Sequence, residues 1–116
     1  SIRFGASTAA EDEKDLSRVT MSLELFETYT AGFLGACGAR LTGPETDTLP
    51  LGAKLMTLEC GTRFLADYLN GDIYFHVTRE GQNLDRARTQ MKLVADMEAK
   101  WNEMNEIVRR EAGRAR

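Results

Sequence analysis

The sequence predicts one domain that is mainly α-helical, with three main helices, one short helix and a short extended segment. The 116 residues are enough for one domain and too few for two ordinary ones. Three stretches carry apolar residues at three- and four-residue steps, which is the spacing of one helix face. Serine, threonine, proline and glycine stand where these stretches begin and end, which favours capped helices.

Residues 1–20 precede the first main helix and are small and polar, with an acidic cluster at residues 11–15. We expect an irregular or extended segment here, with at most one short helical turn around residues 10–16, and a solvated acidic cluster. The first main helix begins at Ser22, because a serine hydroxyl accepts a hydrogen bond from the first helical turn. Its apolar face is formed by Phe26, Tyr29, Phe33, Cys37 and Leu41.

Three glycines, Gly32, Gly35 and Gly38, fall within this first helix. Each costs roughly 1 kcal/mol relative to alanine in a helix interior. We expect them to be tolerated because they let another helix pack closely.

A short helix is predicted over about residues 43–48. Thr42 and Glu45 have the spacing of a capping box, in which each side chain accepts a hydrogen bond from the backbone amide of the other residue. Pro44 suits the first turn of a helix, where its missing amide hydrogen is not needed.

The second main helix is predicted over about residues 50–70. Pro50 suits its first turn, and Gly71 after Asn70 supplies the left-handed conformation of a C-terminal cap. Apolar residues surround most of its circumference, so we expect it to be the central and most buried helix. These apolar residues are Leu51, Leu55, Met56, Leu58, Cys60, Phe64, Leu65, Tyr68 and Leu69.

Apolar and polar residues alternate over residues 73–78, which predicts a short extended strip. Asn83 is expected to cap the third main helix, which would run from residue 84 to about residue 110, a length of roughly 40 Å. Its apolar stripe is typical of packing between helices. The stripe is formed by Met91, Val94, Met97, Trp101, Met104 and Val108.

Charge and apolar pattern exclude several classes of partner. The net charge of -3 gives no general attraction to nucleic acid, so we expect no nucleic-acid partner. No apolar run approaches the roughly 20 residues needed to span a bilayer, and no signal peptide is visible. We therefore expect a cytoplasmic protein without a membrane partner. Cys37, Cys60 and His76 lack the spacing of a zinc site, so no structural metal is expected.

No catalytic constellation is complete in the sequence. It has no Walker-type phosphate loop, no HExxH motif and no Cys/His pair at a useful spacing. The most informative single residue is Arg63, because it stands in an apolar helical stretch and burying a guanidinium is costly unless it is paired. Two interpretations stay open. Either Arg63 forms an ion pair with Glu59 or Asp67, one turn away, or it points into a cleft and binds a polar ligand.

Three strings, "SIRFGASTAAEDE", "LPLGAKLMTLECGTRFLADYLNGDIYF" and "NLDRARTQMKLV", resemble the C-terminal part of bacterial sugar kinases. The relatives are N-acetylhexosamine kinases, some labelled mucin-desulfating, in the aminoglycoside phosphotransferase and choline kinase superfamily. The likeness extends from about residue 1 to residue 105. It implies that residues 1–116 are one helical subdomain, in the C-terminal lobe of a two-lobed, protein-kinase-like enzyme.

The resemblance also implies where the chemistry lies. The nucleotide lobe, the catalytic aspartate and the metal-binding aspartates would all precede Ser1 in a longer protein. ATP and magnesium would belong to that protein, and the chain alone would be inactive. By similarity, Arg63 and Tyr74 are expected to contact the sugar, with Trp101 as a weaker candidate. The alternatives are a packed aromatic beneath a loop for Tyr74 and a core residue for Trp101.

Two functions therefore stay open for this chain. The first is the substrate-side subdomain of an ATP-dependent kinase that phosphorylates the anomeric hydroxyl of an N-acetylhexosamine or related sugar. The second is a free-standing helical interaction module that dimerises through the Met/Trp stripe of the last helix. We expect the isolated chain to form a homo-oligomer, because apolar surface that a missing lobe covers would favour association.

Overall fold

The computed structural model describes residues 6–115, and over these residues the chain is mainly α-helical and contains no strand. An isolated antiparallel bridge joins Ser7 to Met21 in the N-terminal segment. The elements are η1 (Leu16–Arg18), α2 (Leu23–Cys37), η2 (Gly38–Arg40), α3 (Gly43–Asp47), α4 (Leu49–Leu69), α5 (Gln82–Ala99) and α6 (Trp101–Ala115). The mainly helical fold class is confirmed. The extended strip expected over residues 73–78 is wrong, since this segment is an irregular loop with bends at Tyr74, Phe75 and Thr78.

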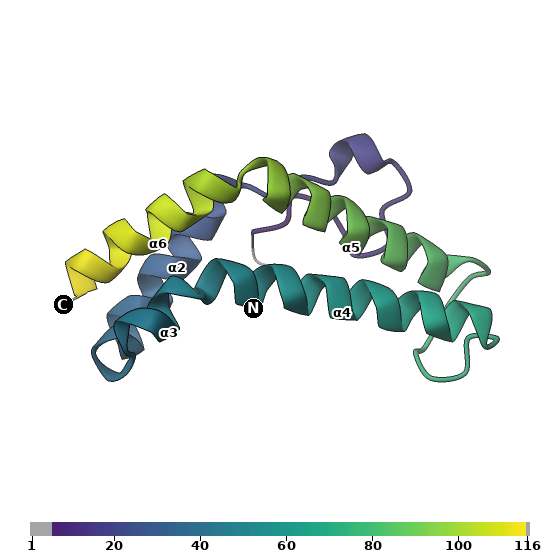
Figure 1. The fold of residues 1–116 in the computed structure, drawn as a ribbon. Helices are drawn as coiled ribbons and strands as arrows, with labels where there is room; N and C mark the ends of the chain where they lie inside the picture. The colour runs from purple at the N-terminus through teal and green to yellow at the C-terminus, as the bar shows by residue number, and fades with distance from the viewer. Residues whose placement is uncertain (1–5, 116) are drawn as a thin grey trace.

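The helices form an elongated arrangement of 48 × 26 × 19 Å. The two longest helices, α4 and α5, lie side by side, and α6 packs against α2 at the opposite end from the α4–α5 loop (Figure 1). The N-terminal segment runs along α5 and brings η1 against it. None of the helices described over residues 6–115 has the length and apolar character needed to cross a bilayer.

The predicted helix ends are confirmed where an interaction between residues close in the sequence caps the helix. The Ser22 side chain accepts a hydrogen bond from the amide of Leu25 and begins α2. Thr42 and Glu45 form both hydrogen bonds of the capping box at the start of α3. The left-handed conformation of Gly71, with φ of 95°, follows the end of α4.

The long third helix predicted over residues 84–110 is wrong in one respect: it is broken at Lys100 into α5 and α6. The Lys100 amide donates to the carbonyl of Asp96 and ends α5, while its own carbonyl accepts from the Met104 amide in the first turn of α6. The bend allows α5 to pack along α4 and α6 to pack along α2.

The break is held by the N-terminal segment. Lys100 Nζ donates to the carbonyl of Met21 at 2.6 Å and to Asp96 Oδ2 at 2.8 Å, and the same carboxylate accepts from the Met21 amide. Burial would raise the pKa of Asp96, but the hydrogen bonds from Lys100 and Met21 lower it below its usual value. The ionised carboxylate therefore anchors Met21 where α5 ends.

The core lies where α2, α5 and α6 meet the N-terminal segment. Met97 and Met104 from the predicted stripe are fully buried there, whereas Met91 lies at the surface. The core cluster consists of Ala6, Val19, Met21, Phe26, Leu93, Met97, Met104, Ile107 and Val108.

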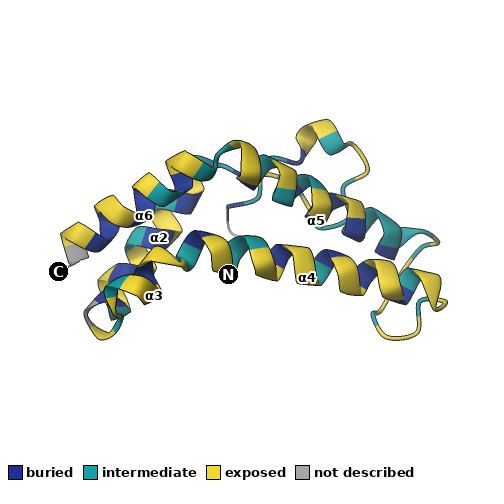
Figure 2. Cartoon of the chain, in the orientation of Figure 1, coloured by how far each residue is buried: buried dark blue, intermediate teal, exposed yellow. Residues whose placement is uncertain are grey.

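The prediction that α4 is the most buried helix is wrong. One side of α4 faces α5 and buries Thr57, Gly61, Phe64 and Asp67. On the side turned away from α5, five leucines are between 38% and 73% exposed (Figure 2). Periodicity failed here because apolar residues surround the helix, and it cannot tell which of them find a partner. We call these five residues the α4 leucine stripe: Leu51, Leu55, Leu58, Leu65 and Leu69.

Gly32 and Gly35 of α2 do not serve close packing, contrary to the prediction for these two residues. A Cβ atom added at Gly32 or Gly35 would meet nothing within 4 Å. Close approach occurs instead at Gly61 of α4, where an added Cβ would lie 2.6 Å from Met91 Cε and 3.1 Å from Gln90 Cβ. Gly61 is therefore the residue that lets α4 and α5 pack closely.

Candidate functional site

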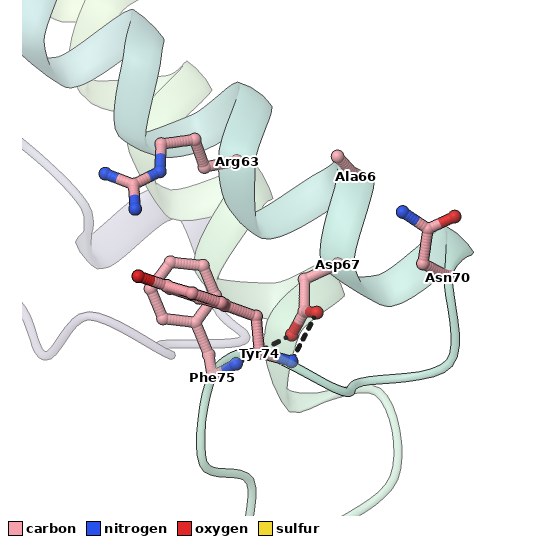
Figure 3. Close-up of a pocket in the computed structure, with 6 residues that line it drawn as sticks. All are labelled: Arg63, Ala66, Asp67, Asn70, Tyr74 and Phe75. Carbon is pink, nitrogen blue, oxygen red and sulfur yellow. Dashed lines mark hydrogen bonds between the residues drawn. The ribbon is translucent and has the colours of Figure 1, made fainter.

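An open hollow lies at the end of α4, where the chain turns toward α5. Its volume is about 350 Å³. The last two turns of α4 form one wall, and the loop after Gly71 forms the other (Figure 3). The lining residues are Arg63, Ala66, Asp67, Asn70, Tyr74 and Phe75.

Asp67 holds the loop wall of this hollow in place. Its side chain is buried, and its two oxygens accept hydrogen bonds from the amides of Tyr74 at 2.8 Å and Phe75 at 3.0 Å. Asn83 of α5 donates a further hydrogen bond of 2.8 Å to Asp67 Oδ2. One carboxylate thus joins α4, the loop and α5.

Two opposing effects act on the pKa of Asp67. Burial raises the pKa, because a carboxylate is less stable away from water. The backbone amides of Tyr74 and Phe75 and the side chain of Asn83 lower it, and the net pKa lies below its usual value of 3.8. Because the pKa of Asp67 is lower in the folded chain than in the unfolded chain, the ionised carboxylate stabilises the fold at pH values above the unfolded-state pKa. This stabilisation is lost as the pH falls through the folded-state pKa.

Arg63 lies on the exposed side of α4, so the premise of a buried guanidinium is wrong. Its guanidinium carbon is 5.8 Å from the ring centre of Tyr74 and 5.6 Å from that of Phe75. These are cation–π distances. The open alternative of an ion pair with Glu59 or Asp67 is also wrong, since Arg63 pairs with no acidic side chain within residues 6–115. Its hydrogen-bond donors are therefore available at the hollow.

The two aromatic residues of the loop differ in how they are held. The ring of Phe75 lies 4.8 Å from that of Phe64 on α4, which anchors it to the helix. Tyr74 meets Phe75 edge-on at 4.9 Å and is 75% exposed. The alternative of an aromatic packed beneath the loop is therefore wrong for Tyr74, which stands at the surface beside Arg63.

Trp101 lies apart from the hollow. It begins α6, where it is half-buried against the core, and Lys54 Nζ is 5.4 Å from its ring centre. Lys54 is nine residues before Arg63 on α4, which is about 13 Å along the helix. The structure brings Arg63 and Tyr74 together and does not bring Trp101 to them.

A second group of polar residues supports the loop from α5. Arg86 donates to the carbonyl of His76 at 3.0 Å and to Asn83 Oδ1 at 2.9 Å. Asn83 is fully buried within α5, so its prediction as the helix cap is wrong; Gly81 precedes the first residue of that helix instead. Sequence reasoning missed the roles of Asn83 and Arg86, because their partners Asp67 and His76 are distant in the sequence and meet them only in the folded chain.

The acidic cluster near the N-terminus is not fully solvated, contrary to the prediction. Asp12 accepts from Gln82 Nε2 at 3.0 Å and pairs with Arg79 at 3.4 Å. The hydrogen bond from Gln82 lowers the pKa of Asp12 despite its partial burial. Arg79 also pairs with Asp85 at 2.7 Å, so this cluster ties the N-terminal segment to the start of α5.

Within the part of the chain that the structure describes, no three His, Cys, Asp or Glu side chains gather as a metal site would require. No protein-family model matches the sequence. The arrangement at the hollow is one of hydrogen-bond donors and aromatic surface, which suits binding and orienting a polar ligand.

Proposed function

We propose that this chain is the substrate-side helical subdomain of an ATP-dependent kinase for an N-acetylhexosamine or a related sugar. The observation that carries the proposal is the pairing of Arg63 with Tyr74 at one open hollow, with no acidic partner for the guanidinium within residues 6–115. The likeness of three strings of the sequence to sugar kinases supports it. The phosphoryl acceptor would be the anomeric hydroxyl.

The chemistry of the two residues suits a sugar. A guanidinium carries five N–H donors, which hydroxyl and acetamido oxygens can accept. A tyrosine ring offers an apolar face for the sugar ring and a hydroxyl for its edge. Trp101 stays the weaker candidate for a sugar contact, because its ring lies beside Lys54, which is about 13 Å from Arg63 along α4.

Phosphoryl transfer needs positioned metal ions and groups that hold the phosphates. The described side chains do not gather as a magnesium site, so in this proposal ATP and magnesium are held by a catalytic part that precedes Ser1 in a longer protein. The chain itself contributes by binding and orienting the sugar, and alone it transfers no phosphate.

The α4 leucine stripe supports the idea of a missing neighbour. Contiguous apolar surface is uncommon on an isolated soluble domain and marks an interaction site. Along α4 this surface covers the side turned away from α5. In the proposal, the upstream catalytic part covers this stripe.

Two properties of the full-length gene test the proposal: the sequence it encodes upstream of Ser1 and the reaction that its protein catalyses. Its reading frame upstream of Ser1 should encode an H-x-D-x-x-x-x-N loop and a D-x-D metal motif. The purified protein should convert an N-acetylhexosamine and ATP to the sugar 1-phosphate, measured by ³¹P NMR. A reading frame that begins at Ser1, or a full-length protein that leaves every N-acetylhexosamine unchanged, would contradict the proposal.

A second candidate function is a helical module that binds a second copy of itself. The Met/Trp stripe first considered for this role does not fit, because Met97 and Met104 are buried in the chain's own core. The α4 leucine stripe fits better: Leu51, Leu58 and Leu65 are seven residues apart, the heptad spacing of a two-helix seam.

Sedimentation velocity of the chain tests whether the stripe causes association. We expect a concentration-dependent oligomer that Leu58→Glu shifts to the monomer, because the seam cannot bury a charge without cost. Leu25→Glu on α2 is a matched control, since Leu25 and Leu58 are 39% and 40% exposed. A monomer at high concentration would contradict the module. Association that disappears when the upstream part is attached would favour the kinase.

A further inference from the structure

We infer that Asp67 is a positioning residue for the sugar site: its carboxylate fixes the loop backbone so that the Tyr74 ring stands beside Arg63. The link to a sugar rests on the proposed function. The positioning itself rests on contacts within the described chain and can be tested without any sugar.

The course of the backbone brings the loop to this carboxylate. After α4 the chain turns back through two left-handed residues, Gly71 with φ of 95° and Asp72 with φ of 60°. The Asp72 amide donates to the carbonyl of Asp67 at 2.8 Å. The next residues return to the side chain of Asp67, whose oxygens accept from the amides of Tyr74 and Phe75 (Figure 3).

Packing alone does not fix the Tyr74 ring. The ring is 75% exposed, and its described contacts are the edge of Phe75 and the guanidinium of Arg63. An exposed aromatic side chain with few contacts samples several rotamers, and the backbone φ/ψ decides which of them are allowed. The two amide hydrogen bonds to Asp67 restrict that backbone, so they determine where the ring can lie.

An ionised aspartate is suited to this task in a way that asparagine is not. Each of its oxygens accepts one amide, whereas the side chain of asparagine has one acceptor and one donor group. Asn83 holds the carboxylate from α5 and also donates to Asp72 Oδ1 at 3.1 Å. Besides Asp67, the charged side chains of this network come from three elements: Asp72 from the loop, Arg86 from α5 and Glu11, which pairs with Arg86, from the N-terminal segment.

The first test uses ¹H–¹⁵N NMR of the chain itself. The Tyr74 and Phe75 amide signals should titrate together with a midpoint below 3.8, the ordinary pKa of an aspartate, because the pKa of Asp67 is lowered. In Asp67→Asn both amides should lie at shifted positions, and the contact between the Tyr74 ring and Arg63 should weaken. Unchanged amides and an unchanged ring contact in this variant would overturn the inference.

A variant that fails to fold would not leave the inference untested, since the pH titration uses the unaltered chain. If the two amides titrate with a midpoint above 3.8, the ordinary pKa of an aspartate, they do not stabilise the ionised carboxylate and the inference fails. Asp47→Asn, at an exposed position on α3, is the matched control and should leave both amides unchanged.

The second test uses the full-length kinase of the proposed function. Asp67→Asn should raise the KM for the sugar about 10- to 100-fold, the scale of a contact displaced by roughly 1 Å, and leave the KM for ATP unchanged. A shifted Tyr74 amide with an unchanged sugar KM would overturn the role in sugar binding. An enzyme inactive on every sugar would contradict the proposed function, while the amide titration would still decide the positioning role.

Discussion

If the chain belongs to the proposed sugar kinase, Arg63→Ala in the full-length protein is expected to lower kcat/KM for the N-acetylhexosamine by about 10- to 150-fold. Hydrogen bonds to a charged group contribute about 1.5–3 kcal/mol, and each 1.36 kcal/mol corresponds to about tenfold in rate. The KM for ATP should stay unchanged, because in the proposed function ATP is held by the catalytic part upstream of Ser1 and not by the hollow. Steady-state kinetics with each substrate varied in turn measures the effect.

The same variant should remain folded, which separates a binding role from a structural one. Arg63 is exposed and its described contacts are with two aromatic rings. A cation–π contact at an exposed site contributes about 0.5–1 kcal/mol, so thermal unfolding should shift only slightly. Arg109→Ala, on the exposed side of α6, is the control and should leave kcat/KM unchanged. Loss of folding in Arg63→Ala, or unchanged kcat/KM, would contradict the assignment.

Helix ends could be predicted from the sequence because the interactions that make them are local. Ser22 bonds the amide three residues later, and Thr42 and Glu45 bond each other. The left-handed Gly71 needs only the absence of a Cβ atom. These signals lie within four residues of one another, so a short stretch of sequence contains them completely.

Features that depend on distant partners could not be predicted. The break at Lys100 is held by Met21, which is 79 residues away. Apolar residues surround α4, and the side that is buried is decided by the contact between Gly61 and α5. Periodicity records which faces are apolar; it does not record which of them another helix covers.

The residues of the candidate site also fall into those that could be predicted from the sequence and those that could not. Arg63 and Tyr74 were expected from the family resemblance, and the structure brings their side chains together. The sequence suggests Asp67 only as an ion-pair partner of Arg63, whereas its donors are the backbone amides of Tyr74 and Phe75 and the side chain of Asn83. A possible signal was its place one turn before Asn70-Gly71, where a carboxylate can meet the returning chain.

Gly61→Val is expected to destabilise the chain by about 1–3 kcal/mol, the usual cost of overpacking a close contact. Even a Cβ atom at this position would lie 3.1 Å from Gln90 Cβ, which is near the α5 backbone and cannot move away alone. Met91 Cε, at 2.6 Å, is the end of a flexible side chain and can rotate aside. The added methyl groups of valine would therefore push α4 from α5, and urea unfolding measures the loss.

Gly35→Ala on α2 is the control for Gly61→Val, because it shows whether the loss of stability comes from the close approach of two helices. Nothing lies within 4 Å of the Cβ position at Gly35, so alanine should stabilise the chain by about 0.4–1 kcal/mol through the unfolded state. Because Gly61 and the hollow share α4, a shifted helix would also move Arg63 relative to the loop that α5 supports. Equal stability of the two variants would mean that α4 and α5 do not approach closely at Gly61, and the pairing of helices that positions the hollow would be incorrect.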